Sequence, residues 1–186
     1  MNEKNLLIVL IILIIIVGII FFIDGHFLSK ASGGNIIFQP AHTADWDVDS
    51  NRTKLVLKDK GFYFTNLTNG TNTVSIFKNN STHSFDGTSD LIFEFDYRAA
   101  NPFTTYLVTG DGERVPVGQP GNVKNTWVHE KWVYDSANQK ITEYVNGEEK
   151  SPVDLSGKNR TTLGFQVVDW QGDINLYIED WKVCRG

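Results

Sequence analysis

The chain has 186 residues, and its 22 acidic and 17 basic side chains give a formal net charge of −5. This acidic balance argues against a nucleic-acid partner, which would need a basic face. The single cysteine, Cys184, excludes an intrachain disulfide, so a folded domain must be held together by its core.

Residues 6–23 read LLIVLIILIIIVGIIFFI and contain no charged or hydrogen-bonding side chain. As a helix this segment is roughly 27 Å long, close to the roughly 30 Å hydrocarbon core of a bilayer. We therefore predict a transmembrane anchor in contact with lipid, after a cytoplasmic tail over 1–5. A cleaved signal peptide is the alternative, because Ser29, Lys30 and Ala31 form a small-x-small triplet.

Both alternatives send the remainder of the chain out of the cytoplasm, and the anchor predicts a single-pass protein of the cell membrane with an extracellular C-terminal domain. Residues 24–34 end in Ser-Gly-Gly and are predicted to form a flexible stalk. Residues 35–186 are long enough for one domain with a substantial core. Asn-x-Ser/Thr triplets predict glycosylation there, unless these residues only share turns: Asn51, Asn66, Asn69, Asn79, Asn80 and Asn159.

Period-two alternation predicts strands and almost no helix in this domain. It is clearest over 91–98, where Leu91, Phe93, Phe95 and Tyr97 alternate with mostly charged residues. The other predicted strands are 35–39, 54–57, 62–65, 74–78, 104–109, 127–134, 141–145, 163–168 and 174–183. Turn residues separate them, and Asn146-Gly147 is the clearest hairpin signal. The expected fold is all-β, a two-sheet antiparallel sandwich preceded by one N-terminal transmembrane helix.

The C-terminal half resembles the concanavalin A-like lectin/glucanase and laminin-G-like jelly rolls. The matching positions lie in core and turns: Trp127, Tyr134, Asp135, Tyr144, Val145, Asn146, Gly147, Leu163, Gly164, Phe165, Tyr177, Ile178, Asp180 and Val183. The run Phe85-Asp86-Gly87 is similar to the same superfamily. The resemblance implies a jelly roll and identifies no ligand by itself.

The resemblance offers a test for catalysis. Glycoside hydrolases on this jelly roll use Glu-x-Asp-x-x-Glu, because retaining hydrolysis needs two carboxyl groups about 5 Å apart. Glu94 and Asp96 match the first part, but Ala99 stands where the second glutamate belongs. We therefore predict no catalytic residue and no enzymatic activity.

Alternate aspartates, typical of the start of a calcium loop, occur at Asp45, Asp47 and Asp49. In an EF-hand starting there, Ser50 replaces the glycine and Val56 the bidentate glutamate, so the motif fails. No metal ligand or cofactor is predicted. Calcium is left open as an alternative, with Asp169 and Asp173 as further oxygen donors.

Surface recognition remains. Carbohydrate-binding jelly rolls stack aromatic rings on sugars and flank them with carboxylate, amide and guanidinium groups. The predicted ligand-binding set joins the noncore face of 91–98 to two further strands: Glu94, Asp96, Arg98, Tyr106, Gln166 and Trp170. His129 joins this set if its strand is a neighbour. The resemblance places Trp127, Trp132 and Trp181 in the core, whereas Trp46 and Trp170 are candidates for exposure.

The prediction is a membrane-anchored, noncatalytic, adhesin-like surface domain that binds a carbohydrate or a cell-surface protein. The alternative is a structural or assembly protein of a cell or particle envelope that binds protein partners rather than sugar. A groove lined by Trp170, Tyr106 or Arg98 would favour glycan binding. A flat apolar patch would favour assembly.

Overall fold

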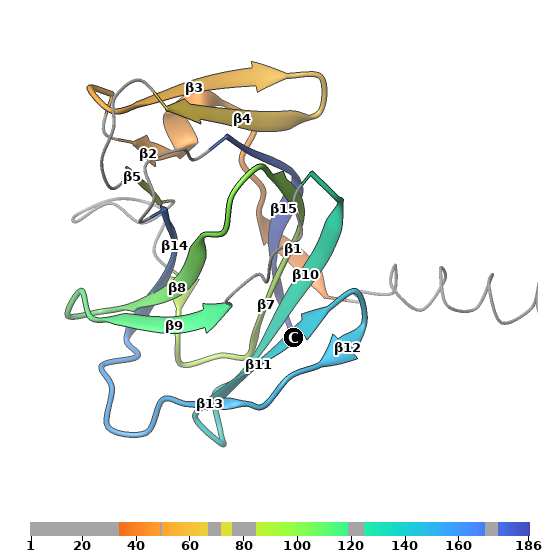
Figure 1. Ribbon diagram of the computed structural model, residues 1–186. Coiled ribbons are helices and arrows are strands. Elements are labelled where there is room, and N and C mark those ends of the chain that lie inside the picture. Colours follow the sequence, from red (N-terminus) through yellow and green to blue (C-terminus); the bar gives the residue numbers. More distant parts are fainter. Residues whose placement is uncertain (1–33, 49, 67–71, 76–84, 119–124, 170–174) are drawn as a thin grey trace, which may run out of the picture. The chain divides into compact units, whose positions relative to one another are not determined.

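The computed structural model describes residues 34–48, 50–66, 72–75, 85–118, 125–169 and 175–186, which lie in one compact unit (Figure 1). The predicted tail, anchor and all but one residue of the stalk lie outside these residues and stay predictions. Among the described residues, no helix is long and apolar enough to span a membrane.

Two antiparallel sheets form the domain. Sheet A has nine strands in the order β12-β11-β10-β7-β15-β4-β3, with β1 also beside β15 and β13 beside β11. Its strands are β1 (Asn35–Phe38), β3 (Thr53–Lys58), β4 (Gly61–Asn66), β7 (Leu91–Ala99), β10 (Val128–Asp135), β11 (Lys140–Val145), β12 (Glu148–Glu149), β13 (Val153–Asp154) and β15 (Leu176–Arg185).

Sheet B has six strands in the order β2-β5-β14-β8-β9, with β6 also beside β14. They are β2 (Asp47–Val48), β5 (Asn72–Ser75), β6 (Phe85–Asp86), β8 (Thr104–Thr109), β9 (Arg114–Gly118) and β14 (Thr162–Asp169). A single turn of 3-10 helix, η1 (Thr43–Asp45), is the one helical element in the described part of the chain. The predicted all-β, two-sheet antiparallel sandwich is confirmed.

Each of the ten predicted strands overlaps an observed strand. The two-residue strands β2, β6, β12 and β13 were not predicted, and neither was β9. It contains Pro116, which lacks a backbone N–H and normally argues against a strand. β9 tolerates the proline because it is the edge strand of sheet B, with only β8 as a hydrogen-bonded neighbour.

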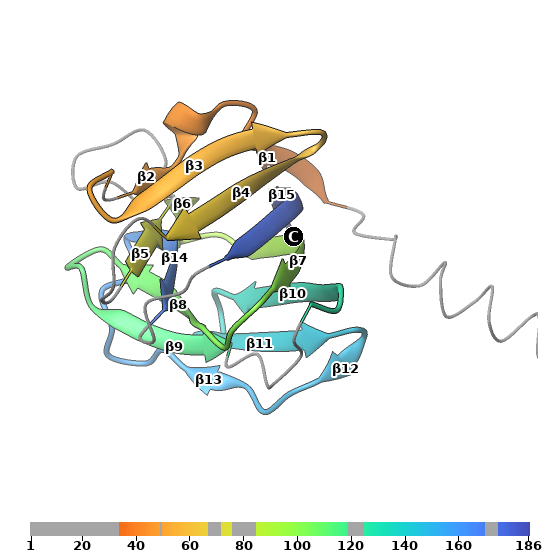
Figure 2. The ribbon, with the colours of Figure 1, turned by 45° about the horizontal axis from the view of Figure 1, so that its top comes forward.

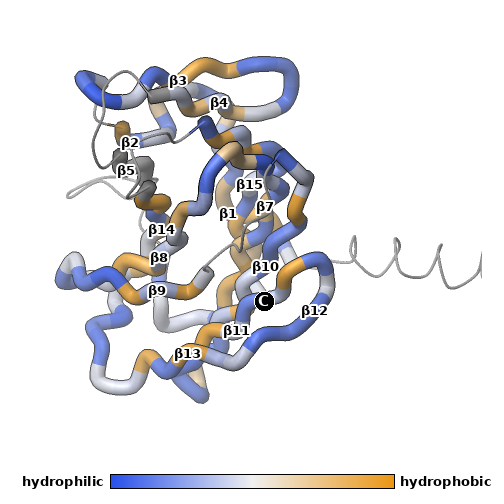
Figure 3. The backbone as a smooth tube through the Cα atoms, viewed as in Figure 1, coloured by the Kyte–Doolittle hydropathy of each residue, from blue (hydrophilic) through white to orange (hydrophobic). Residues whose placement is uncertain are grey.

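The core lies between the sheets, on the face that alternation predicted for β7. Leu91, Phe93, Phe95 and Tyr97 are all at most 2% exposed. Figure 3 shows both apolar and hydrophilic stretches along the strands. Trp132 and Trp181 are also buried, as the resemblance implied. Trp46 is only 3% exposed, so its proposed exposure was wrong: its ring packs 5.1 Å from that of Phe64.

A β-bulge interrupts β15 between Glu179 and Lys182, and Asp180 there has a φ of 51°. One extra residue reverses the alternation of a strand. Tyr177 and Glu179 before the bulge therefore share the outward face of sheet A with Lys182 after it, while Trp181 turns into the core.

The predicted Asn146-Gly147 hairpin is confirmed between β11 and β12. Asn146 has a φ of 51° and Gly147 a φ of 84°, the two left-handed conformations that a two-residue type I′ turn requires. The turn also supports β10, because the His129 backbone N–H donates to the Asn146 side-chain oxygen at 2.9 Å.

Two glutamates lie inside the sandwich, where β9 of sheet B approaches β11 of sheet A (Figure 2). Glu130 is fully buried, and the Trp132 indole N–H donates to its carboxylate at 2.5 Å. A β-carbon on Gly118 would lie 2.6 Å from Glu130 and 3.0 Å from Glu143, so only glycine leaves room for both. Burial, and then the Glu143 charge, raise the pKa of Glu130 to about 8.

This raised pKa makes stability depend on pH. The folded state holds the Glu130 proton more tightly than the unfolded state, so the contribution is fully present below about pH 4.5 and is lost as the pH rises through about 8. We expect Glu130→Gln to flatten this slope. At about pH 9 it should raise the free energy of unfolding by on the order of a few kcal/mol, and therefore raise the melting temperature. Melting curves across pH check it.

Glu149→Gln, on exposed β12, is the matched control and should melt as the parent does at every pH. A Glu130→Gln variant with the pH slope of the parent would contradict the assignment.

Candidate functional site

The structure divides the predicted ligand-binding set between two faces. Glu94, Asp96 and Arg98 lie on the outward face of sheet A, opposite the core residues of β7. Tyr106 and Gln166 are register partners in sheet B, on the face turned away from core residues Phe165 and Val167. The two groups lie on opposite sides of the sandwich, so they do not form the single groove that was expected. Trp170 lies outside the described residues.

Glu94 and Asp96 on β7 already contact charged side chains of the two neighbouring strands. His129 lies beside them, as predicted, because β10 pairs with β7 and sets His129 opposite Asp96. His129 Nδ1 lies 2.8 Å from Asp96 Oδ1, and its Nε2 lies 3.4 Å from Glu94 Oε1. Lys182 Nζ lies 3.3 Å from the other oxygen of Glu94. Glu94 is only 4% exposed, so little of it is left for a ligand.

The hydrogen bond to Asp96, and then that to Glu94, raise the pKa of His129 to about 9. At neutral pH the imidazolium therefore donates from both ring nitrogens. Asp96, His129, Glu94 and Lys182 form a charge network in which two anions meet two cations.

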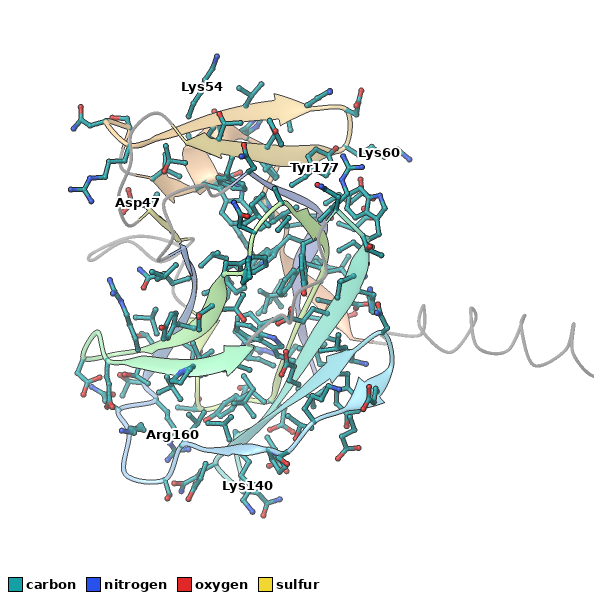
Figure 4. All side chains as sticks on the ribbon, in the orientation of Figure 1. Asp47, Lys54, Lys60, Lys140, Arg160 and Tyr177 are labelled. Carbon is teal, nitrogen blue, oxygen red and sulfur yellow. The ribbon has the colours of Figure 1, made fainter. Side chains whose placement is uncertain are left out.

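Beyond this network, the outward face of sheet A holds a groove of about 440 Å³. This volume lies in the range of small-molecule binding sites. Three aromatic and five charged side chains line the groove: Lys58, Asp59, Lys60, Tyr63, Arg98, Trp127, Tyr177 and Glu179. They come from β3, β4, the turn between them, β7, β15 and the residue before β10. Figure 4 shows Lys60 and Tyr177 near the β3–β4 turn.

The aromatic rings form a connected surface. Trp127 is 42% exposed and contacts Tyr177 edge to face, with ring centroids 5.4 Å apart. Tyr177 in turn lies 6.3 Å from Tyr63. The Arg98 guanidinium carbon lies 5.4 Å from the Trp127 ring centroid, a cation–π contact. A partly exposed aromatic surface with polar neighbours suits a ligand that has both apolar faces and hydroxyl groups.

Tyr177 is fixed in the groove by the β3–β4 hairpin. Its hydroxyl donates to the Lys58 backbone carbonyl at 2.9 Å. Gly61 begins β4 beneath the ring, where a β-carbon would lie 2.8 Å from Tyr177 Cζ and 2.6 Å from the Ile178 carbonyl oxygen. The groove therefore needs glycine at this position.

The placement of Trp127 corrects the expectation that it belongs to the core. Val128, Glu130, Trp132 and Tyr134 face inward on β10, so residue 127 has the opposite parity and faces outward. This parity was present in the sequence, since Trp127 and Trp132 are five positions apart. Lys58, Lys60, Tyr63, Tyr177 and Glu179 were also missed, because only the sheet order brings them together.

Among the described residues, no three His, Cys, Asp or Glu side chains are grouped so as to hold a metal ion. Asp45 is used locally, since its carboxylate accepts the backbone N–H groups of Ala41 and His42 at 2.8 Å. Asp49 and Asp173 lie outside the described residues, so calcium stays an open alternative.

The predicted glycosylation sites are described in part. Asn51 and Asn159 are exposed, and the Asn159 side-chain oxygen accepts from the Thr161 hydroxyl of its own triplet at 2.8 Å. Asn69, Asn79 and Asn80 lie outside the described residues, and Asn66 ends β4. All six stay predictions.

No family model matches the sequence, and no curated protein matches it. Solved structures share the fold. A protein of unknown function with a galectin-like fold from Bacillus subtilis aligns with a TM-score of 0.56 and 10% identity, over 82% of this chain and 96% of that chain. Peanut lectin with a 9-mer peptide aligns with a TM-score of 0.52 and 12% identity, over 80% of this chain and 94% of that chain.

A sialidase aligns with a TM-score of 0.54 and 10% identity over 75% of this chain, which spans only 17% of the sialidase. Together with the sheet topology, these likenesses establish the concanavalin A-like jelly-roll fold that the sequence resembles. At such identities they establish the fold alone, because one fold hosts many functions.

The charge network gives a titration test. We expect the ring-proton NMR signals of His129 to titrate with a midpoint of about 9. In Asp96→Asn, the midpoint should fall by roughly 1 to 2 pH units, because the largest cause of the raised pKa is removed.

Asp135→Asn is the control. Asp135 lies at the far end of β10, where its carboxylate accepts the Asn138 backbone N–H, so this substitution should leave the His129 midpoint unchanged. A His129 midpoint that does not respond to Asp96→Asn would disprove the network.

Proposed function

We propose that this protein is a noncatalytic surface domain, anchored by residues 6–23, that binds glycan in an adhesin-like role. The groove around Trp127, Tyr177 and Tyr63 is its binding site. The observation that carries the proposal is the partly exposed aromatic surface flanked by carboxylate, ammonium and guanidinium groups within one groove. Sugars need both kinds of surface, because their C–H faces are apolar and their edges carry hydroxyl groups.

The fold is compatible with this role, since a lectin is among the structures with which it aligns. A sialidase is another, so the fold does not decide between binding and catalysis. The noncatalytic assignment is supported by Glu94 and Asp96, which form ion pairs with His129 and Lys182 where hydrolases of this fold carry catalytic acids.

Assembly with protein partners is the second candidate, and edge strand β3 favours it. Val56 and Leu57 on this strand are 39% and 48% exposed. An exposed apolar edge strand can pair with another chain. Because β3 also contributes Lys58 to the groove, binding measurements on groove variants separate the two roles.

The glycan-binding proposal predicts that the full chain, solubilised in mild detergent, binds at least one member of a broad glycan array. Trp127→Ala should weaken that binding roughly five- to hundredfold, because a stacked ring contributes about 1 to 3 kcal/mol. The change should leave the melting temperature nearly constant, since Trp127 is 42% exposed.

Tyr106→Ala, on the outward face of sheet B, is the control and should bind as the parent does. A loss confined to Tyr106→Ala would move the site to sheet B. If no glycan on the array binds, the glycan-binding proposal is wrong and the assembly role is the remaining candidate.

The anchor predicts that the full-length protein stays in the membrane fraction after alkaline carbonate washing, because a spanning helix is held by its hydrophobic length. Added protease should remove the domain from intact cells. Release of a soluble fragment beginning at Ser32 would show that residues 6–23 are instead a cleaved signal peptide.

A further inference from the structure

Three cations line the groove, and they lack the partners that neutralise other charges of the domain. Lys150, Lys158 and Lys182 each form an ion pair, with Glu148, Glu113 and Glu94 respectively. Within the described part of the chain, no carboxylate lies close enough to pair with Lys58, Lys60 or Arg98. The groove thus gathers three cations that form no such ion pair among the described residues, beside the exposed ring of Trp127, on a chain whose formal net charge is −5.

The two carboxylates of the groove offset this charge only in part. Asp59 lies in the exposed β3–β4 turn. Glu179 is half-buried. Burial, followed by the charges of Asp180 and Asp96, raises its pKa, while the charges of Lys60 and Arg98 act in the opposite direction. Its ionised form is therefore held less firmly than that of an exposed glutamate. Asp96 itself is committed to His129 at 2.8 Å.

Given the proposed function, on which this inference rests, we infer that the groove binds an acidic glycan. A sugar unit bearing a carboxylate or a sulfate places its ring against Trp127 and its anionic group between Arg98 and Lys60. The guanidinium fork suits a planar carboxylate or two sulfate oxygens, and the ammonium supplies a second charge. Arg98 already lies against Trp127, so anion and ring are recognised side by side.

The test compares each of two acidic polymers with a neutral polymer that has the same sugar backbone. The full chain in detergent is titrated with polygalacturonate and with its neutral methyl ester, and with dextran sulfate and dextran. We expect one acidic polymer to bind at least about tenfold more tightly than its neutral counterpart, and to weaken with added salt. The first pair reports carboxylate recognition and the second reports sulfate recognition.

Lys60→Gln and Arg98→Gln should each weaken binding of the acidic polymer about tenfold or more. Lys54→Gln is the matched control, because Lys54 is an exposed lysine on the same sheet, about 13 Å along β3 from Lys58 and away from Lys60 in Figure 4. It should bind as the parent does.

Two results overturn the inference. One is equal, Trp127-dependent binding of the acidic and neutral polymers, which would leave the proposed glycan function standing. The other is a loss in Lys54→Gln as large as that in Lys60→Gln, which would mean general attraction between charges. A chain that binds no polymer here and no glycan on the array loses the proposed function as well.

Discussion

The Trp181 side chain packs at the junction of the two sheets. Its ring lies 5.4 to 6.4 Å from rings of both sheets and of the segment after η1: Phe38, Trp46, Phe85, Phe93 and Phe165. Truncating a buried tryptophan typically costs about 3 to 5 kcal/mol. Since Cys184 is the chain's one cysteine, no internal disulfide shares this task. The attachment of the sheets depends on this aromatic packing.

The bulge at Asp180 connects that packing to the outward face. A strict alternation along β15 would send Tyr177, Glu179 and Trp181 to one face. The extra residue lets Trp181 enter the core while Tyr177 and Glu179 keep their places in the groove, and it also brings Lys182 outward to Glu94. Core and candidate site therefore constrain the same strand, and a one-residue slip of β15 would damage both.

The sequence predicted well what depends on local pattern. Alternation assigned the inward face of β7, and Asn146-Gly147 identified its hairpin, because both signals lie within a few consecutive residues. Sheet membership is a long-range property, so the sequence did not show that Tyr106 and Gln166 lie in sheet B, away from the outward residues of β7 in sheet A. Glu130 follows the inward parity of β10 yet is acidic, and only the structure shows the Trp132 N–H that makes its burial tolerable.

The same long-range pairing explains why Glu94 and Asp96, two of the predicted ligand-binding residues on β7, have little capacity left to bind a ligand. Strands β10 and β15 flank β7 and set His129 and Lys182 beside Asp96 and Glu94, so that the two carboxylates and the two cations neutralise one another. Charges that satisfy one another in this way offer little to a ligand, because a ligand would have to replace interactions already made. Arg98, one step further along β7, meets Trp127 instead of a carboxylate. Its guanidinium lines the groove, so the site that we propose lies at the end of β7 rather than along its middle.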